Sequence, residues 1–123
     1  MAPNASTAFG VWWTALRQRV DELGAKVPPA LKGTILIELR GPGLEVAYRA
    51  LRLAEGRVEI VEHHVPGDDA LLSFRGDEMP SLLQANLEPP EPEVWGDTEL
   101  VDGFFQHLAS RTSQSLLSLR ARR

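Results

Sequence analysis

The fold of this chain is decided by residues 33–65, which read GTILIELRGPGLEVAYRALRLAEGRVEIVEHHV. Apolar and polar residues alternate along this stretch, and a period of two predicts strands near 33–40, 44–53 and 57–65. The turns between these strands, Gly-Pro-Gly and Ala-Glu-Gly, are only three residues long. Because a parallel crossover needs about a dozen residues, such short turns make neighbouring strands antiparallel.

Each predicted strand presents apolar residues on one face, as expected for a sheet packed on one side. In the second strand we expect Tyr48 and Ala50 on the apolar face and Arg49 and Leu51 on the other. The remaining members of the apolar face are Leu44 and Val46 in the second strand, Ile35, Ile37 and Leu39 in the first, and Val58 and Ile60 in the third.

Two long helices are predicted from apolar residues at steps of three and four. The first covers 6–25, begins with Ser6 or Thr7 as N-cap and stops near Gly24. The second covers 97–119, with Asp97 as N-cap. Their apolar stripes contain Phe9, Trp12, Trp13, Leu16, Val20, Leu23 and Val27 in the first helix, and Leu100, Val101, Phe104, Phe105, Leu108 and then Leu116 or Leu119 in the second.

Shorter elements complete the order α-β-β-β-β-α-β-α. A strand at 70–74 places Leu72 and Phe74 on one side, and a short helix with Leu83 follows it. The run 93–95 adds a fifth short strand. We therefore predict an α+β fold, an antiparallel-rich five-stranded sheet covered by helices on one face. We expect residues 1–123 to form one domain, with the main sheet over 33–74.

The composition excludes several classes of function. The chain has 123 residues, no cysteine, and 13 basic against 17 acidic side chains, which gives a net charge of −4. Without cysteine there is no disulfide scaffold, iron–sulfur cluster or thiol nucleophile, and the lack fits a cytoplasmic location. The negative charge argues against nucleic acid as a partner. No run of about 20 apolar residues predicts a transmembrane helix.

Polar residues with catalytic or ligand chemistry are few. His63 and His64 are adjacent on a strand, so they point to opposite faces and do not share a metal. Adding Asp68 or Asp69 supplies two ligands, whereas a catalytic zinc needs about three. We expect no metal, no cofactor and no catalytic residue. His107 is expected at the surface or edge of the last helix.

Charge is unevenly distributed toward the end of the chain. Residues 88–102 contain six acidic side chains and no basic one, whereas 111–123 contain four arginines and no acidic one. The simplest interpretation is a solvated face and a helix-terminal tail. Two alternatives are homodimer formation through these complementary charges and contact of the tail with anionic lipid headgroups at a membrane surface.

Five segments, in this order and spacing, resemble the sterol carrier protein 2 (SCP2)-like lipid-binding family. They are LKGTILIEL at 31–39, AEGRVEI at 54–60, GDDALLSF at 67–74, MPSLL at 79–83 and VWGDTEL at 94–100. Within the family, the runs LRGPGL and WGDTELV look most like the lipid-binding domain of bacterial ubiquinone-biosynthesis accessory factors. The resemblance implies a non-enzymatic protein that holds a lipid or a prenylated quinone intermediate between sheet and helices.

Large apolar side chains on the helices and the sheet fit such a cavity. We expect the ligand pocket to be lined by Trp12, Ile37, Tyr48, Leu72, Phe74, Leu83, Trp95, Phe104, Phe105 and Leu108. One alternative function is a protein–protein interaction module, an accessory factor of a biosynthetic complex with a closed core. Another is a small enzyme such as an isomerase, which would need an inward-facing carboxylate or histidine with a shifted pKa.

Overall fold

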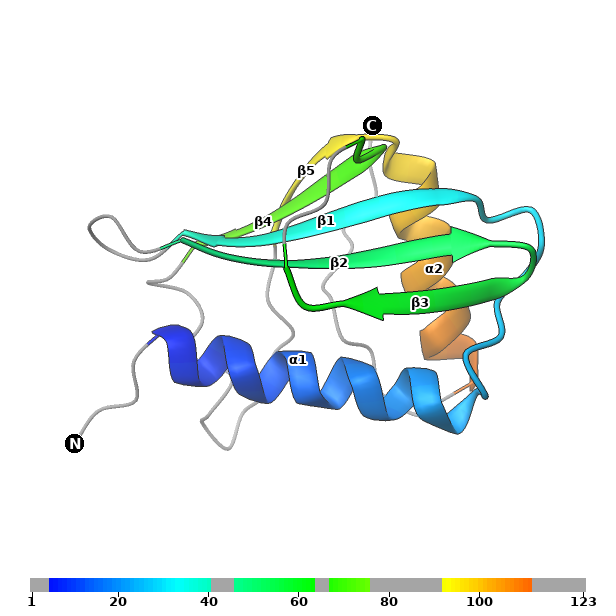
Figure 1. The fold of residues 1–123 in the computed structure, drawn as a ribbon, viewed down its shortest axis with the longest axis horizontal. Helices are drawn as coiled ribbons and strands as arrows, with labels where there is room; N and C mark the ends of the chain where they lie inside the picture. The colour runs from blue at the N-terminus through cyan, green and yellow to red at the C-terminus, as the bar shows by residue number, and fades with distance from the viewer. Residues whose placement is uncertain (1–4, 41–45, 64–66, 76–91, 112–123) are drawn as a thin grey trace.

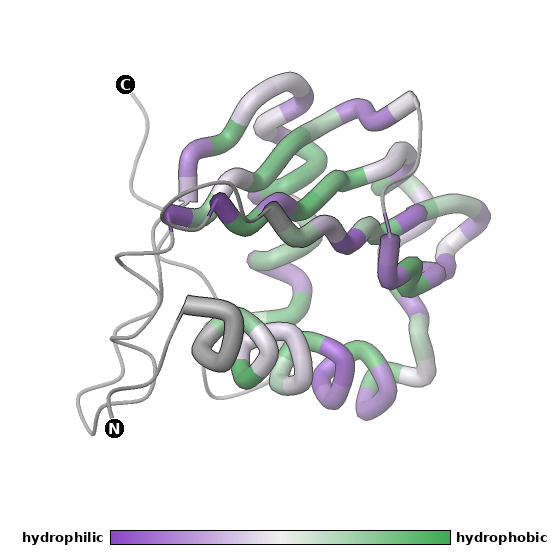
Figure 2. The backbone as a smooth tube through the Cα atoms, turned by 60° about the vertical axis from the view of Figure 1, so that its left-hand side comes forward, coloured by the Kyte–Doolittle hydropathy of each residue, from purple (hydrophilic) through white to green (hydrophobic). Residues whose placement is uncertain are grey.

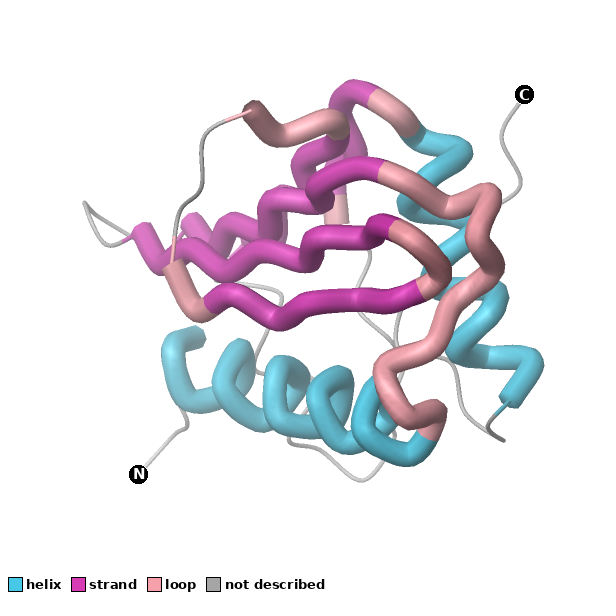
Figure 3. Tube along the Cα trace, turned by 45° about the vertical axis from the view of Figure 1, so that its right-hand side comes forward, coloured by secondary structure: helices cyan, strands magenta, loops and turns pink. Residues whose placement is uncertain are grey.

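The structure is a computed structural model that describes residues 5–40, 46–63, 67–75 and 92–111. Helix α1 lies along the strand direction, and α2 crosses near one end of the sheet (Figures 1 and 3). Neither helix is both long enough and apolar enough to span a bilayer. The elements are α1 (Ala5–Glu22), β1 (Gly33–Arg40), β2 (Val46–Ala54), β3 (Arg57–Val61), β4 (Ala70–Arg75), β5 (Glu93–Gly96) and α2 (Thr98–Arg111).

Some sequence predictions fall outside the described residues. These are the short helix with Leu83, the side chains of Ser6 and Thr7, Leu44 at the start of the second strand, and the extension of the last helix to residue 119. Most of the arginine-rich tail and the start of the acidic segment lie there as well. The predicted strand at 93–95 is confirmed as β5.

The sheet has five strands in the order β3-β2-β1-β4-β5. The pairs β1–β2 and β2–β3 are antiparallel, which confirms the prediction from their short turns. Strand β5 also pairs antiparallel with β4. Strand β4, however, runs parallel to β1, so the sheet is mixed.

The parallel placement of β4 is the one departure from antiparallel pairing among the described strands of a sheet that we predicted to be antiparallel-rich. Val61 at the end of β3 pairs with Ala50, Ala50 with Leu36, and Leu36 with Leu71 in β4. Strand β4 therefore begins almost at the level where β3 ends. The connection 62–69 only has to cross sideways, by about three strand spacings of roughly 4.8 Å each. The rule for tight turns does not apply to a connection of this length.

Helix α1 ends at Glu22, three residues before the predicted end. Gly24 and Ala25 have positive φ angles of 65° and 59°, which are incompatible with a continued helix. The amide of Ala25 donates to the carbonyl of Val20 at 2.9 Å, as in a helix C-cap of the Schellman type. The carbonyl of Ala25 then accepts from the amide of Val58 at 2.9 Å, so the end of α1 is joined to β3.

The start of α2 is capped as predicted. The Oδ1 atom of Asp97 accepts a hydrogen bond from the amide of Leu100 at 3.1 Å, which satisfies one of the free amides of the first turn. Gly96 precedes the cap with φ +85°, a conformation that favours glycine. The amide of Asp97 donates to the carbonyl of Asp69 at 2.9 Å and holds this junction against β4.

The helices and one face of the sheet share a single apolar core. Figure 2 shows hydrophobic positions recurring along both helices and the strands, with hydrophilic positions between them. Within the described residues, the apolar stripes predicted for both helices are confirmed, since their members pack in this core. Leu23 and Val27 pack there as well but follow the end of α1, and Leu116 and Leu119 lie outside the described residues. The sheet contributes Ile35, Ile37 and Leu39 from β1, Leu51 and Leu53 from β2, Val58 and Ile60 from β3, Ala70, Leu72 and Phe74 from β4, and Val94 from β5.

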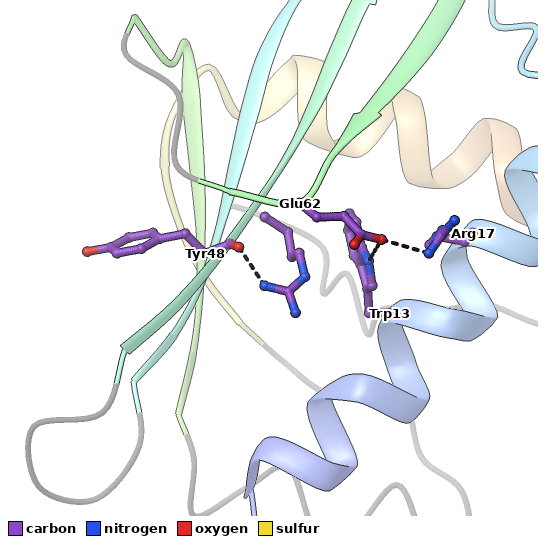
Figure 4. Close-up of polar contacts among 5 residues, drawn as sticks. Trp13, Arg17, Tyr48 and Glu62 are labelled. Carbon is purple, nitrogen blue, oxygen red and sulfur yellow. Dashed lines mark hydrogen bonds and ion pairs between the residues drawn. The ribbon is translucent and has the colours of Figure 1, made fainter.

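Strand β2 faces the helices with the side opposite to the one we predicted. Leu51 is fully buried in the core with the helices, whereas Tyr48 packs with Ala50 and Leu36 in a smaller cluster on the other face. Figure 4 shows the Tyr48 ring pointing away from α1. Because β2 carries apolar residues on both sides, its own pattern cannot select the face; the pairing of Leu51 with Ile35 does.

Candidate functional site

Aromatic rings fill the space between the two helices and β4. Trp12 of α1 is central, with ring centroids 4.7 Å from Phe74 of β4, 6.0 Å from Phe9 and 6.4 Å from Phe105 of α2. Phe105 in turn meets Phe104 edge-on at 5.1 Å. These tilted and offset pairs are favourable arrangements for aromatic side chains. The two helices and the sheet are therefore joined by a continuous apolar, aromatic interior.

The structure brings most of the predicted pocket residues together in this interior. Tyr48 instead lies on the other face of the sheet. Trp95 lies on the edge strand β5 and is 58% exposed, and Leu83 is outside the described residues. The predicted residues that share the buried core are Trp12, Ile37, Leu72, Phe74, Phe104, Phe105 and Leu108.

A pocket of about 500 Å³ lies between the C-terminal part of α1, the segment that follows it, and α2. Val27 belongs to the apolar core and Leu23 packs against it, so the apolar wall of the pocket is continuous with the aromatic interior. His107 contributes a polar wall and is half-buried, in keeping with the edge position that we expected on its helix. The complete lining in the described part is Glu22, Leu23, Lys26, Val27, Pro28 and His107.

Polar side chains gather where α1 passes the end of β3. The Oε1 atom of Glu62 accepts from Arg17 at 2.6 Å and from the indole nitrogen of Trp13 at 3.4 Å (Figure 4). The charged side chains of Arg17 and Glu62 are each 52% exposed, so this ion pair contributes little stability. Arg49 of β2 lies beside them, with its guanidinium carbon 5.9 Å from the centroid of the Trp13 ring.

Known structures resemble this arrangement of sheet and helices. The sterol carrier protein 2 like 2 of Aedes aegypti matches with a TM-score of 0.53 over 79% of this chain and 93% of its own, at 13% identity. This chain has the SCP2 fold. The resemblance drawn from the sequence motifs is thus confirmed at the level of the fold.

Other structures match less well. A ubiquinone synthesis protein, UbiJ-SCP2, gives a TM-score of 0.47 at 19% identity, over 84% of this chain and 97% of its own. The MycE methyltransferase of mycinamycin biosynthesis gives 0.38 at 21% identity, over 81% of this chain and 29% of its own. No protein-family model and no curated protein sequence matches the chain.

The SCP2 sheet of this chain holds a buried carboxylate on the face away from the helices. Glu38 is 7% exposed, and its Oε1 atom accepts from the Ser73 hydroxyl at 2.9 Å and from Arg40 Nε at 2.6 Å. The hydrogen bond and the charge of Glu38 raise the pKa of Arg40. An isomerase would need an inward-facing acid or base. Among the described residues, no acidic or histidine side chain is buried in the core between sheet and helices.

Asp69, one of the acidic residues weighed as a metal ligand, has a structural role instead. Its Oδ2 atom accepts from the amide of Thr34 at 2.8 Å, and its own amide donates to the Thr34 carbonyl at 2.8 Å. An aspartate in a turn commonly accepts from an amide close by in the sequence. The partner is an amide of β1, and the bond fixes the entry into β4. Within the described ranges, no three potential ligands among His, Asp and Glu lie together.

Sequence reasoning missed Arg49, Glu62 and the pocket lining at Glu22 and Lys26. The signal for Arg49 was present, because an arginine shares a strand face with Leu51 and Leu53. We assigned that face to solvent, so the arginine looked ordinary. The pocket lining carried no sequence signal, since it is assembled from a helix end, a loop and a second helix.

Proposed function

We propose that this protein binds and carries a lipid or a prenylated quinone intermediate in the apolar interior between its sheet and helices, without catalysing a reaction on it. The proposal places the protein in the cytoplasm, in keeping with its lack of cysteine. The observation that carries it is the aromatic interior around Trp12, which continues into the wall of the pocket at Leu23 and Val27. The SCP2 fold supports it, because the matched Aedes aegypti protein is by name like a sterol carrier.

Transfer of an apolar chain out of water would drive this binding. Burying about 500 Å² of acyl or isoprenoid surface contributes about 12 kcal/mol at roughly 25 cal/mol per Å². Association costs at least about 4 kcal/mol of translational and rotational freedom. The remainder of about 8 kcal/mol corresponds to a Kd in the micromolar range. The proposed lining comprises Trp12, Ile37, Leu72, Phe74, Phe104, Phe105 and Leu108.

Phe104 provides the test, since it is fully buried and lies on the wall that α2 presents to the sheet. We would measure binding of the methyl ester of cis-parinaric acid, an uncharged chain that fluoresces in apolar surroundings. In a ligand cavity, Phe104→Trp adds volume where the chain lies, so the protein stays folded and the Kd of the probe rises about tenfold. Val11→Trp is the matched control, because Val11 is 47% exposed.

A solid core without a ligand cavity predicts a different result for Phe104→Trp. In a solid core, Phe104→Trp overpacks the interior and destabilises the protein by about 1–3 kcal/mol. If that loss occurs and the parent protein shows no saturable binding of the probe, the carrier function is wrong. Binding that Val11→Trp weakens as strongly as Phe104→Trp would place the probe outside the interior.

An interaction module is the second candidate, and one observation favours it. Trp95 is 58% exposed on β5, and it pairs across the strands with Leu71, which pairs with Leu36. Large exposed aromatic residues are typical of protein interfaces. Failure of the probe to bind, together with a destabilised Phe104→Trp variant, would make this module the better interpretation of the fold.

A further inference from the structure

Arg49 occupies an unusual position for a charged side chain. It pairs across the sheet with Ile37, which is fully buried, so its side chain belongs to the face covered by the helices. Its guanidinium carbon lies 5.7 Å from the centroid of Phe9 and 5.9 Å from that of Trp13, both on α1. Contacts of this kind between a cation and aromatic faces are favourable. The guanidinium of Arg49 thus lies where the aromatic interior meets the polar side chains of Arg17 and Glu62.

The charge of Arg49 is not neutralised within the described part of the chain. One terminal nitrogen donates to the Tyr48 carbonyl at 2.7 Å, while Nε is buried and has no acceptor there. The nearby carboxylate of Glu62 is engaged by Arg17 and Trp13 instead. Arg17, Arg40 and Arg52 each form an ion pair with a glutamate, whereas no ion pair joins Arg49 to another described residue.

A guanidinium keeps its charge at any physiological pH, and a partly buried charge is costly unless an anion meets it. Among the described residues at this site, the formal charges of Arg17, Arg49 and Glu62 sum to 2 − 1 = +1. The surplus is positive, and the guanidinium carbon of Arg49 lies over the rings of Phe9 and Trp13. A fitting ligand therefore combines a negative head with an apolar body.

We propose that Arg49 determines specificity by binding the anionic head of an amphiphile, a carboxylate or a phosphate, whose apolar chain lies among the rings of the interior. The fork of donors on arginine matches both head groups and forms paired hydrogen bonds with them. This inference rests on the proposed function, because it assumes that an apolar chain binds next to α1. It adds that the preferred ligand is charged and names the residue that selects it.

The test compares head groups on one chain. The uncharged methyl ester of cis-parinaric acid is bound first and then displaced by dodecanoate, dodecyl phosphate or dodecanol, each below its micelle concentration. In the parent protein, at least one charged competitor should act at about tenfold lower concentration than dodecanol, since hydrogen bonds to a charged group are strong. The more effective of the two acids identifies the head group.

The variant Arg49→Met should remove this advantage and leave displacement by dodecanol unchanged within about twofold. Arg52→Met is the matched control: it removes the same charge from the same strand, but Arg52 is exposed and pairs with Thr34 on the opposite face. Its preference for charged competitors should persist. Arg49→Gln, which keeps a donor for the Tyr48 carbonyl, serves if Arg49→Met does not fold.

Two results overturn the inference while leaving the proposed function intact. In one, dodecanol competes as well as the charged compounds in the parent protein. In the other, the charged compounds keep their advantage in both Arg49 variants. A third result, no binding of the ester to the parent protein, refutes the proposed function itself and the inference with it.

Discussion

Gly96 joins β5 to α2, and replacing it with alanine tests the closest backbone approach at this junction. Its φ angle is +85°, and an added Cβ would lie 2.5 Å from the carbonyl oxygen of Asp69 and 3.2 Å from Cα of Ala70. The same carbonyl oxygen accepts a hydrogen bond from the amide of Asp97 at 2.9 Å. Both obstacles are backbone atoms, so a side-chain rotation cannot relieve them.

The magnitude follows from two contributions. A residue with a Cβ in the left-handed region costs roughly 1–2 kcal/mol. The Asp69 carbonyl must move away from the added Cβ, which weakens the hydrogen bond that this carbonyl accepts from the Asp97 amide. A lost hydrogen bond costs about 1 kcal/mol or more. We therefore expect Gly96→Ala to lower the free energy of unfolding by about 2–4 kcal/mol. For a domain of this size that corresponds to a fall in Tm of about 10 °C.

Urea denaturation followed by circular dichroism measures the loss, and Gly67→Ala is the matched control. Gly67 has φ +77°, but an added Cβ there meets nothing within 4 Å. It therefore reports the conformational cost alone, roughly 1–2 kcal/mol. If the two variants lose the same free energy within about 0.5 kcal/mol, the junction of β5 and α2 does not pack against the Asp69 backbone as described.

Two further predictions concern α2 and β2. Asp97→Ala should lower the free energy of unfolding by about 1 kcal/mol in urea denaturation, because it removes the acceptor for the Leu100 amide. Asp97→Asn should retain most of the stability, and an unchanged midpoint for Asp97→Ala would contradict the cap. Leu51→Ala should cost about 2–5 kcal/mol, and more than Tyr48→Ala, because Leu51 is fully buried between sheet and helices; the reverse order would place the core on the other face of β2.

Local features of the sequence predicted much of this molecule. The short turns at Gly-Pro-Gly and Ala-Glu-Gly required antiparallel neighbours, and β1–β2 and β2–β3 have that pairing. The cap at Asp97 depends on a side-chain oxygen that accepts a hydrogen bond from the amide of Leu100, three residues further along the chain. The apolar stripes of α1 and α2 follow from the helical repeat. All of these depend on residues a few positions apart, and the chain itself enforces such distances.

Tertiary structure decided what short-range rules leave open. The connection 62–69 is long enough for β4 to pair beside β3 or beyond β1. Pairing with β1 on one side and β5 on the other places β4 inside the sheet rather than at its edge. Strand β2 has apolar residues on both faces, so its orientation depends on the register that sets Leu51 beside Ile35. That same register directs Arg49 into the aromatic interior rather than toward solvent. The sequence by itself determined which residues form strands and helices; the distant partners across the sheet determined which side chains face the proposed ligand.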